Sequence, residues 1–333
     1  MTDLLTDTTP SPIKAFLIGK QGHGKTGAKA SLIALGYKLR MLNFDNGADI
    51  LRNLLTNPYY PYHKYMLDNN ISLKSAISVL TITEDMKKIV EDNKSRFVPK
   101  SARGYSRAID MMDSWIDGKE NYGSITTWGD DVILDIDTLG TMADLAYFQI
   151  QELNGRLGAR QEGYDYLRDV GGAQGLLRNL MQTLFSPYIK CNVLINSHVT
   201  WVDEAKGFMS KPNLESLSDP IGYPTAIGIA LSPIVGKWFN NVFIVEQTGS
   251  GLTQKHEIST VPIKNIAAKN SLPGLLKPRY PIETGMAEIF CALRGEKVPQ
   301  ELIDSCGKKK SSVASIPGTI SKVTPIPTKT TAA

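Results

Sequence analysis

One stretch of this sequence decides the fold: Ile13-Lys14-Ala15-Phe16-Leu17-Ile18-Gly19-Lys20-Gln21-Gly22-His23-Gly24-Lys25-Thr26. Its first six residues form a short apolar run that predicts a buried β-strand. The next eight match GxxxxGK[ST], the phosphate-binding P-loop, in which glycines let successive backbone N–H groups converge on phosphate oxygens. A segment compatible with a helix follows at residues 24–35 and would point its positive end at the same phosphates. We therefore predict a nucleotide site formed by Gly19, Lys20, Gln21, Gly22, His23, Gly24, Lys25, Thr26 and Gly27.

The residue types after the glycines define the chemistry of this loop. Lys25 would reach the β- and γ-phosphates, and the hydroxyl of Thr26 would bind Mg²⁺. The cofactors predicted from the loop are thus a nucleoside triphosphate and Mg²⁺.

Composition and charge limit the classes of protein that fit. The chain has 333 residues, of which 42% are hydrophobic and 21% charged, as in a globular protein of one large or two modest domains. Its formal net charge is +4, but five lysines and no acid follow residue 306, so residues 1–306 carry a net charge of −1. Affinity for a nucleic acid must therefore come from a local patch or from the tail.

The two ends of the chain differ in composition from the rest. Residues 307–333 are rich in Ser, Thr, Pro and Lys, which predicts a disordered basic tail. The tail is either a solubilising extension or an arm that binds DNA or a partner. Residues 1–12 are predicted to be a flexible N-terminus, which leaves residues 13–306 as the folded domain.

Location and redox chemistry follow from what the sequence lacks. No apolar run reaches the roughly 18 residues of a membrane helix, and the N-terminus has acids where a signal peptide has bases. Cys191, Cys291 and Cys306 are too few and too scattered for a disulfide framework or a zinc site. We expect a cytoplasmic protein without a membrane partner.

A P-loop enzyme needs a carboxylate from a neighbouring strand to hold its metal. Residues 132–135 form an apolar strand that ends in Asp135, the predicted Mg²⁺ partner of Thr26 and a member of the catalytic set. Asp137 lies on the same face of this strand and is either a second metal ligand or a loop carboxylate. Thr141 and Asp144 have the spacing of a capping box, which predicts a helix starting at Met142.

The order of these parts resembles the RecA/Rad51-like ATPase core. The P-loop is followed by a second strand ending in Phe44-Asp45-Asn46-Gly47, by the Asp135 strand, and by a fourth strand ending in Asn196-Ser197-His198. Within that superfamily the chain resembles phage-encoded Sak4-type proteins, which are single-strand annealing or recombination ATPases. Supporting stretches are Asp113-Ser114-Trp115, residues 223–228 and residues 237–247. The resemblance implies an α/β fold with a mostly parallel central sheet flanked by helices.

The resemblance also implies roles for individual residues. Asp45 stands where the family places a glutamate that activates water, and because aspartate is shorter, a slow ATPase is expected. His198 stands where the family senses the γ-phosphate, and Lys264 or Lys269 would complete the site of a neighbouring subunit. A DNA-contacting loop would lie at residues 200–221. Its candidates for stacking and phosphate contacts are Trp201, Phe208, Lys206 and Lys211.

An insertion at about residues 50–125 separates the second strand from the Asp135 strand. Its tyrosine cluster at residues 59–65 either packs the insertion against the sheet, the favoured interpretation, or stacks on bases. Residues 85–97 have an acidic-basic pattern that predicts a helix. Residues 94–107 are the most basic local stretch, interpreted as a solvated face or a nucleic-acid patch.

These observations predict a Mg-ATP-binding, RecA-like ATPase that acts on single-stranded DNA in phage recombination or annealing. In a phage-encoded protein the site of action would be the host cytoplasm. The expected partners are single-stranded DNA, further copies of the chain and a single-stranded DNA-binding protein. The alternatives are a helicase-like or loader ATPase in replication, and an assembly protein in which nucleotide binding matters more than turnover.

Overall fold

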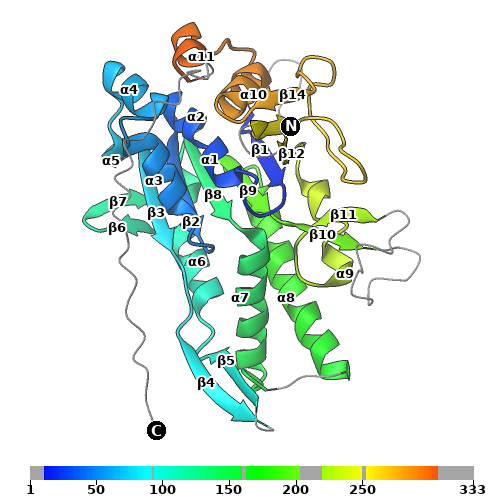
Figure 1. Ribbon diagram of the computed structural model, residues 1–333. Helices are drawn as coiled ribbons and strands as arrows, with labels where there is room; N and C mark the ends of the chain where they lie inside the picture. The colour runs from blue at the N-terminus through cyan, green and yellow to red at the C-terminus, as the bar shows by residue number, and fades with distance from the viewer. Residues whose placement is uncertain (1–10, 92–93, 160–162, 203–219, 250–252, 307–333) are drawn as a thin grey trace, which may run out of the picture.

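A computed structural model describes residues 11–91, 94–159, 163–202, 220–249 and 253–306 (Figure 1). Its centre is an eight-stranded sheet of order β14-β13-β12-β1-β9-β8-β2-β3. The six strands from β12 to β3 are parallel, whereas β13 and β14 each pair in the antiparallel sense with the strand before them in the chain. The bounds of the strands are β1 Lys14–Ile18, β2 Lys38–Asn43, β3 Ile77–Thr81, β8 Val132–Asp137, β9 Asn192–Ser197, β12 Asn241–Thr248, β13 Lys255–Ser259 and β14 Arg279–Pro281.

Helices cover both faces of the sheet, because its central strands are apolar on both sides. In β1, Phe16 and Ile18 face one layer and Ala15 and Leu17 the other. The first layer is formed mainly by α6 Gly104–Asp113, α7 Leu139–Leu153, α8 Gly163–Leu184 and α9 Gly228–Leu231, together with the short turns η1 Ile125–Thr127 and η2 Val235–Trp238. The second layer contains α1 Lys25–Ala28, α2 Ala30–Ala34, α3 Ala48–Thr56, α4 Pro61–Asp68, α5 Leu73–Ala76, α10 Gly285–Arg294 and α11 Gln300–Cys306.

The segment between β2 and β8 corrects one sequence prediction. Residues 85–97, expected to be helical, form most of a hairpin of β4 Met86–Glu91 and β5 Lys94–Pro99, which projects away from the sheet (Figure 1). Arg96 donates to the Gly158 carbonyl oxygen, and Val98 is buried against the same segment. Contacts with a distant part of the chain therefore outweigh the local pattern. The other hairpins are β6 Trp115–Asp117 with β7 Glu120–Gly123, and β10 Val199–Val202 with β11 Ile221–Pro224.

One predicted helix also starts at another residue. Helix α7 begins at Leu139, three residues before the expected start, and Thr141 lies within it. Tyr62 and Tyr65 are buried in the second layer, as the packing interpretation of the tyrosine cluster expected, while Tyr59 is 95% exposed. Among the described residues no helix is both long enough and apolar enough to span a bilayer.

Candidate functional site

The P-loop connects β1 to α1 and lies tightly against β12. Gly22 and Gly24 have φ of 78° and 96°, a left-handed region that glycine enters without steric cost. A Cβ at Gly19 would stand 2.4 Å from the carbonyl oxygen of Val245, closer than real side chains approach. The glycines of the motif therefore allow both the turn and its close approach to the sheet.

The ammonium group of Lys25 lies inside this loop. Its Nζ donates to the carbonyl oxygens of Gly19 and Lys20, at 2.7 and 3.0 Å, and lies 3.2 Å from Nδ1 of His198. Burial lowers the pKa of Lys25 to about 8, although the charge of Asp137 opposes this shift. A group that is this desolvated gains most from an anion placed beside it.

A hydroxyl and a carboxylate meet directly behind the loop, where Oγ1 of Thr26 donates to Oδ2 of Asp137 at 2.7 Å. A Cβ on Gly47 would lie 3.2 Å from the same hydroxyl, so a side chain there would crowd it. Hard oxygen ligands of this kind, completed by phosphate and water oxygens, suit Mg²⁺. The donor set at Thr26 and Asp137 thus fits the metal that the sequence predicts.

The structure does not bring Asp135 to Thr26. Its carboxylate is fully buried and lies 2.5 Å from Nζ of Lys29, which also binds Oδ2 of Asp137 at 2.8 Å. Burial, assisted by the charge of Asp137, raises the pKa of Asp135 to about 7 against the effect of Lys29. Burial acts to raise the pKa of Asp137, but Lys29 together with hydrogen bonds from Asn196 and Thr26 outweighs it and lowers the pKa. The prediction that Asp135 shares a metal with Thr26 is therefore not supported by this geometry, which puts Asp137 in that place.

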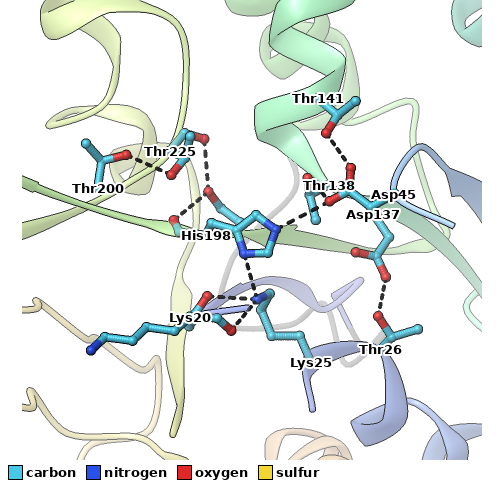
Figure 2. Close-up of polar contacts among 12 residues, drawn as sticks. Lys20, Lys25, Thr26, Asp45, Asp137, Thr138, Thr141, His198, Thr200 and Thr225 are labelled. Carbon is cyan, nitrogen blue, oxygen red and sulfur yellow. Dashed lines mark hydrogen bonds and ion pairs between the residues drawn. The ribbon is translucent and has the colours of Figure 1, made fainter. Parts of the chain in front are cut away.

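Asp45 follows β2 and is held by three side chains (Figure 2). Its carboxylate accepts hydrogen bonds from Thr138, at 2.8 Å, and from Thr141, and it lies 3.4 Å from Nε2 of His198. Burial raises the pKa of Asp45, but the hydrogen bonds from these three residues outweigh it and lower the pKa to about 2. Asp45 is therefore a fixed, ionised acceptor.

His198 lies between Lys25 and Asp45, with one ring nitrogen toward each (Figure 2). A lysine ammonium group can only donate, so the Nδ1 atom that faces it accepts. The proton of a neutral ring is then on Nε2, where it points at the carboxylate of Asp45. The ring thereby connects the group predicted to bind phosphate with the group predicted to act on water.

These residues open into one cleft of about 1560 Å³. Six of the nine predicted P-loop residues line it: Gln21, Gly22, Gly24, Lys25, Thr26 and Gly27. Gly19, Lys20 and His23 contribute backbone to the loop, and the Lys20 side chain points away from Lys25 (Figure 2). Asp45, Asp137 and His198 also line the cleft, and apolar and aromatic residues complete its lining, among them Tyr59, Tyr60, Ile50, Leu54 and Ile282.

Other predicted residues are not part of this cleft. Lys264 and Lys269 do not line it, and their proposed role in a neighbouring subunit stays a prediction. Trp201 lies in β10, with Nζ of Lys20 at 6.0 Å from the centre of its ring. Phe208, Lys206 and Lys211 lie outside the described residues, as do residues 1–10 and the tail from residue 307.

Sequence reasoning missed several residues of the site. Lys29 had a usable signal, because it follows Lys25 by four residues and so shares its side of the helical segment. Thr138 and the Asp45-binding role of Thr141 had none, since the start of α7 decides which hydroxyls reach the carboxylate. His256 also lines the cleft, and its Nδ1 lies 2.9 Å from the carbonyl oxygen of His23.

Comparisons with known proteins add remote likenesses only. No protein-family model and no curated protein matches the chain. Among solved structures it is similar to the KaiC-like protein PH0186 of Pyrococcus horikoshii OT3, with 13% identity, a TM-score of 0.36, and 82% of this chain and 85% of that one covered. It is similar to the flagellar accessory protein FlaH of Methanocaldococcus jannaschii, with 10% identity, a TM-score of 0.34, and 83% of this chain and 88% of that one covered. It is also similar to a type III secretion ATPase of pathogenic bacteria, with 11% identity, a TM-score of 0.33, and 71% of this chain and 51% of that one covered.

Likenesses at this level carry no argument about function, so the class rests on the molecule itself. A P-loop after β1, a parallel order β12-β1-β9-β8-β2, and paired aspartates at the end of β8 define a RecA-like P-loop NTPase fold. Its site has the residues that a nucleoside triphosphate and Mg²⁺ require.

Proposed function

We propose that this protein binds Mg-ATP and hydrolyses it by in-line attack of water. The observation that supports the proposal most is the convergence of Lys25, the Thr26–Asp137 pair and the Asp45–His198 pair in one cleft. Phosphoryl transfer needs little more than positioned groups and positive charge around the transferred phosphoryl. Lys25 and the metal held by the Thr26–Asp137 pair would supply the positive charge, and the Asp45–His198 pair would position the attacking water.

The phosphate side of the site is held by the loop and Lys25. Backbone N–H groups of the loop would bind the phosphate oxygens, and the Lys25 ammonium group would leave its carbonyl partners for the β- and γ-oxygens. Thr26 and Asp137 would hold Mg²⁺, which when bound neutralises charge on those same oxygens. Lys29 keeps Asp137 ionised and oriented from the buried side.

Asp45 acts on the water side. A carboxylate with a pKa of about 2 is a weak base, so its contribution is to orient the attacking water by accepting a hydrogen bond. Oδ1 and Oδ2 already accept from Thr141, Thr138 and His198, which fixes the direction of the remaining lone pair. When Lys25 turns to the γ-phosphate, His198 loses its donor on one side. We assign to His198 the role of reporting the γ-phosphate to Asp45.

The partner in this proposal is single-stranded DNA, and the process is annealing or recombination in a phage. The support is the resemblance of the motif order to Sak4-type proteins and the lysine surplus outside the folded core. Further copies of the chain and a single-stranded DNA-binding protein complete the proposed set, in the cytoplasm of a host cell.

One observation favours a second candidate, a nucleotide-gated assembly protein with little turnover. Asp45 is one methylene shorter than glutamate and is tied to α7 by two threonines. If this restraint keeps the carboxylate from the attacking water, ATP would be bound and slowly consumed. Turnover per site, with and without a single-stranded oligonucleotide, separates the two candidates.

The first experiment compares Lys25→Ala with Lys20→Ala in titration calorimetry with ATP and Mg²⁺. Losing a charged hydrogen-bond donor costs about 1.5–3 kcal/mol, so Lys25→Ala should weaken binding by about 10- to 150-fold. Lys20→Ala removes the same charge from a side chain that points away from Lys25, and should change the affinity less than threefold. Equal affinities for the parent and Lys25→Ala would refute the site assignment.

A further inference from the structure

A second group of residues gathers at the opposite end of the sheet from the P-loop. Lys14 begins β1, Lys190 lies two residues before β9, and Lys237 lies four residues before β12. Lys269 joins them because its backbone bridges Val242 of β12 and its Nζ reaches the carbonyl oxygen of Lys237 at 3.5 Å. Since β12, β1 and β9 are adjacent and parallel, the four lysines share one edge, here called the amino-end patch.

Contacts show that the patch is continuous. Nζ of Lys14 donates to the carbonyl oxygen of Leu184 at 2.7 Å and lies 5.2 Å from the ring centre of Phe185. Phe185 packs edge-on against Phe239, two residues after Lys237 in the chain. Burial is the main cause that lowers the pKa of Lys14, and the charge of Lys190 adds to it, whereas Cys191 opposes it. Lys190 is therefore close enough to Lys14 for the two charges to repel each other.

The charge of the patch has no ion-pair partner among the carboxylates that the structure describes. Within the described part of the chain, none of its four lysines forms an ion pair with a carboxylate. Asp130 and Asp131, which precede β8 at the same edge, are already paired with Arg294 and Lys38. Positive charge that no described carboxylate neutralises, on a chain whose residues 1–306 carry a net charge of −1, indicates a local site for an anion.

Aromatic residues lie beside three of these lysines, in space or in the chain. Tyr188, two residues from Lys190, is 77% exposed. Trp238 and Phe185 are half-buried, and Nζ of Lys237 lies 4.8 Å from the ring centre of Trp238. Lysines that meet phosphates, alternating with aromatic faces on which bases stack, form the surface that binds single strands without reading their sequence.

We propose that the amino-end patch binds single-stranded DNA, with phosphates on Lys190, Lys237 and Lys269 and bases on Tyr188 and Trp238. The proposal rests on the proposed function for the identity of its partner, but not on the ATP site. It places DNA at the end of the sheet away from the P-loop, whereas the sequence expectation placed it on the loop at residues 200–221. ATP and DNA would then bind the same protomer without competing for a surface.

The test is binding of a fluorescent 20-nucleotide oligo-dT by the full chain, measured by anisotropy without nucleotide across 50–300 mM salt. The variant is Lys190→Gln/Lys237→Gln/Lys269→Gln. Each lost phosphate contact should reduce the slope of log K against log salt by about 0.7, or about 2 for the three. At 0.1 M salt this corresponds to about a 100-fold loss of affinity. Tyr188→Ala should cost about tenfold, with little change in slope.

A matched control carries the same charge change on the β4–β5 hairpin and just after it, Lys87→Gln/Lys88→Gln/Lys100→Gln, where all three lysines are exposed. It should retain the parent affinity and slope within experimental error. If this control, rather than the patch variant, lost the binding, the proposal would be overturned in favour of the hairpin. Equal binding by the parent and both variants would overturn it too, as would a preference of more than tenfold for oligo-U RNA.

Two further measurements keep the outcomes distinct. The patch variant should unfold at the same urea concentration as the parent, as surface substitutions do. The Lys190→Gln/Lys237→Gln variant, which keeps Lys269, should bind ATP as the parent does. If the parent binds oligo-dT through the patch but does not bind ATP, the proposed function fails and the inference stands. If ATP binding is normal and the patch variant binds oligo-dT like the parent, the inference fails alone.

Discussion

Lys29 offers the sharpest test of how this site is built. Its Nζ is fully buried and binds one oxygen each of Asp135 and Asp137, at 2.5 and 2.8 Å. In Lys29→Met both carboxylates would remain in a buried site without a cation. Removing one partner of a buried ion pair typically costs 3–5 kcal/mol, because the other partner is left uncompensated. Against a domain stability of about 5–15 kcal/mol, the variant should fold but be markedly weakened.

The expected deficit also depends on pH. Asp135 has a raised pKa, so the folded parent holds this proton more tightly than the unfolded chain, and stability falls as the pH rises from about 4 to about 7. In Lys29→Met the pKa of Asp135 should rise further, because no cation opposes the effect of burial. At pH 6 protonation of Asp135 offsets part of the loss, and the deficit should be about 3 kcal/mol. At higher pH the deficit should grow by up to about 1.4 kcal/mol per unit.

The assay is urea unfolding followed by circular dichroism at pH 6, 7.5 and 9. The matched control is Lys38→Met, because Lys38 pairs with Asp131 at 2.7 Å while both side chains are about half exposed. Lys38→Met should lower the free energy of unfolding by less than about 1 kcal/mol at every pH. Lys29→Met/Asp135→Asn, which removes one of the two orphaned charges, should recover at least 1.5 kcal/mol relative to Lys29→Met. The reasoning is wrong if Lys29→Met and Lys38→Met cost the same, or if the double variant recovers nothing.

Two predictions concern the other carboxylates. Asp137→Asn should raise the Mg²⁺ concentration needed for ATP binding by about 10- to 100-fold. Asp135→Asn should change that concentration less than threefold. A Mg²⁺ titration in which Asp135→Asn has the larger effect would restore Asp135 as the metal ligand. Asp45, with its pKa lowered to about 2, contributes stability that is complete above about pH 4 and is lost as the pH falls through 2. Allowing for solvent screening, Asp45→Asn should remove about 1 kcal/mol of this acid-dependent stability in acid-unfolding curves, and curves identical to the parent would contradict the hydrogen-bond assignment.

The site divides into parts that the sequence could predict and parts that it could not. The P-loop was predictable because its geometry is local, as the positive φ of Gly22 and Gly24 confirms. The carboxyl ends of β2 and β9 must meet near the loop in a parallel sheet, and this brought Asp45 and His198 within reach of Lys25.

The choice between Asp135 and Asp137 was beyond the sequence. Residues two apart in a strand point the same way, and which of them reaches Thr26 depends on how far β8 extends past α1. In the structure Asp135 lies deeper than Asp137, and its carboxylate forms a buried ion pair with Lys29. The helix predicted for residues 85–97 was wrong for a related reason. The acidic and basic residues of this segment satisfy a helical pattern locally, whereas contacts of Arg96 and Val98 with Gly158, about 60 residues away, accompany the hairpin.

The two proposed binding surfaces are joined by a single strand. Lys14 and the P-loop glycine Gly19 stand at opposite ends of β1, about 16 Å apart at the rise of an extended chain. At that separation two unit charges in an effective dielectric of about 20 interact by only about 1 kcal/mol. Phosphates bound at the two ends would therefore repel each other only weakly. If single-stranded DNA changes ATP turnover, as the two proposals together would require, the coupling would therefore be conformational. Neighbouring β9 offers a connection, because Lys190 lies two residues before its first residue and His198 directly follows its last. A shift of β9 along its axis would move Lys190, proposed to contact DNA, together with the His198 ring that lies between Lys25 and Asp45.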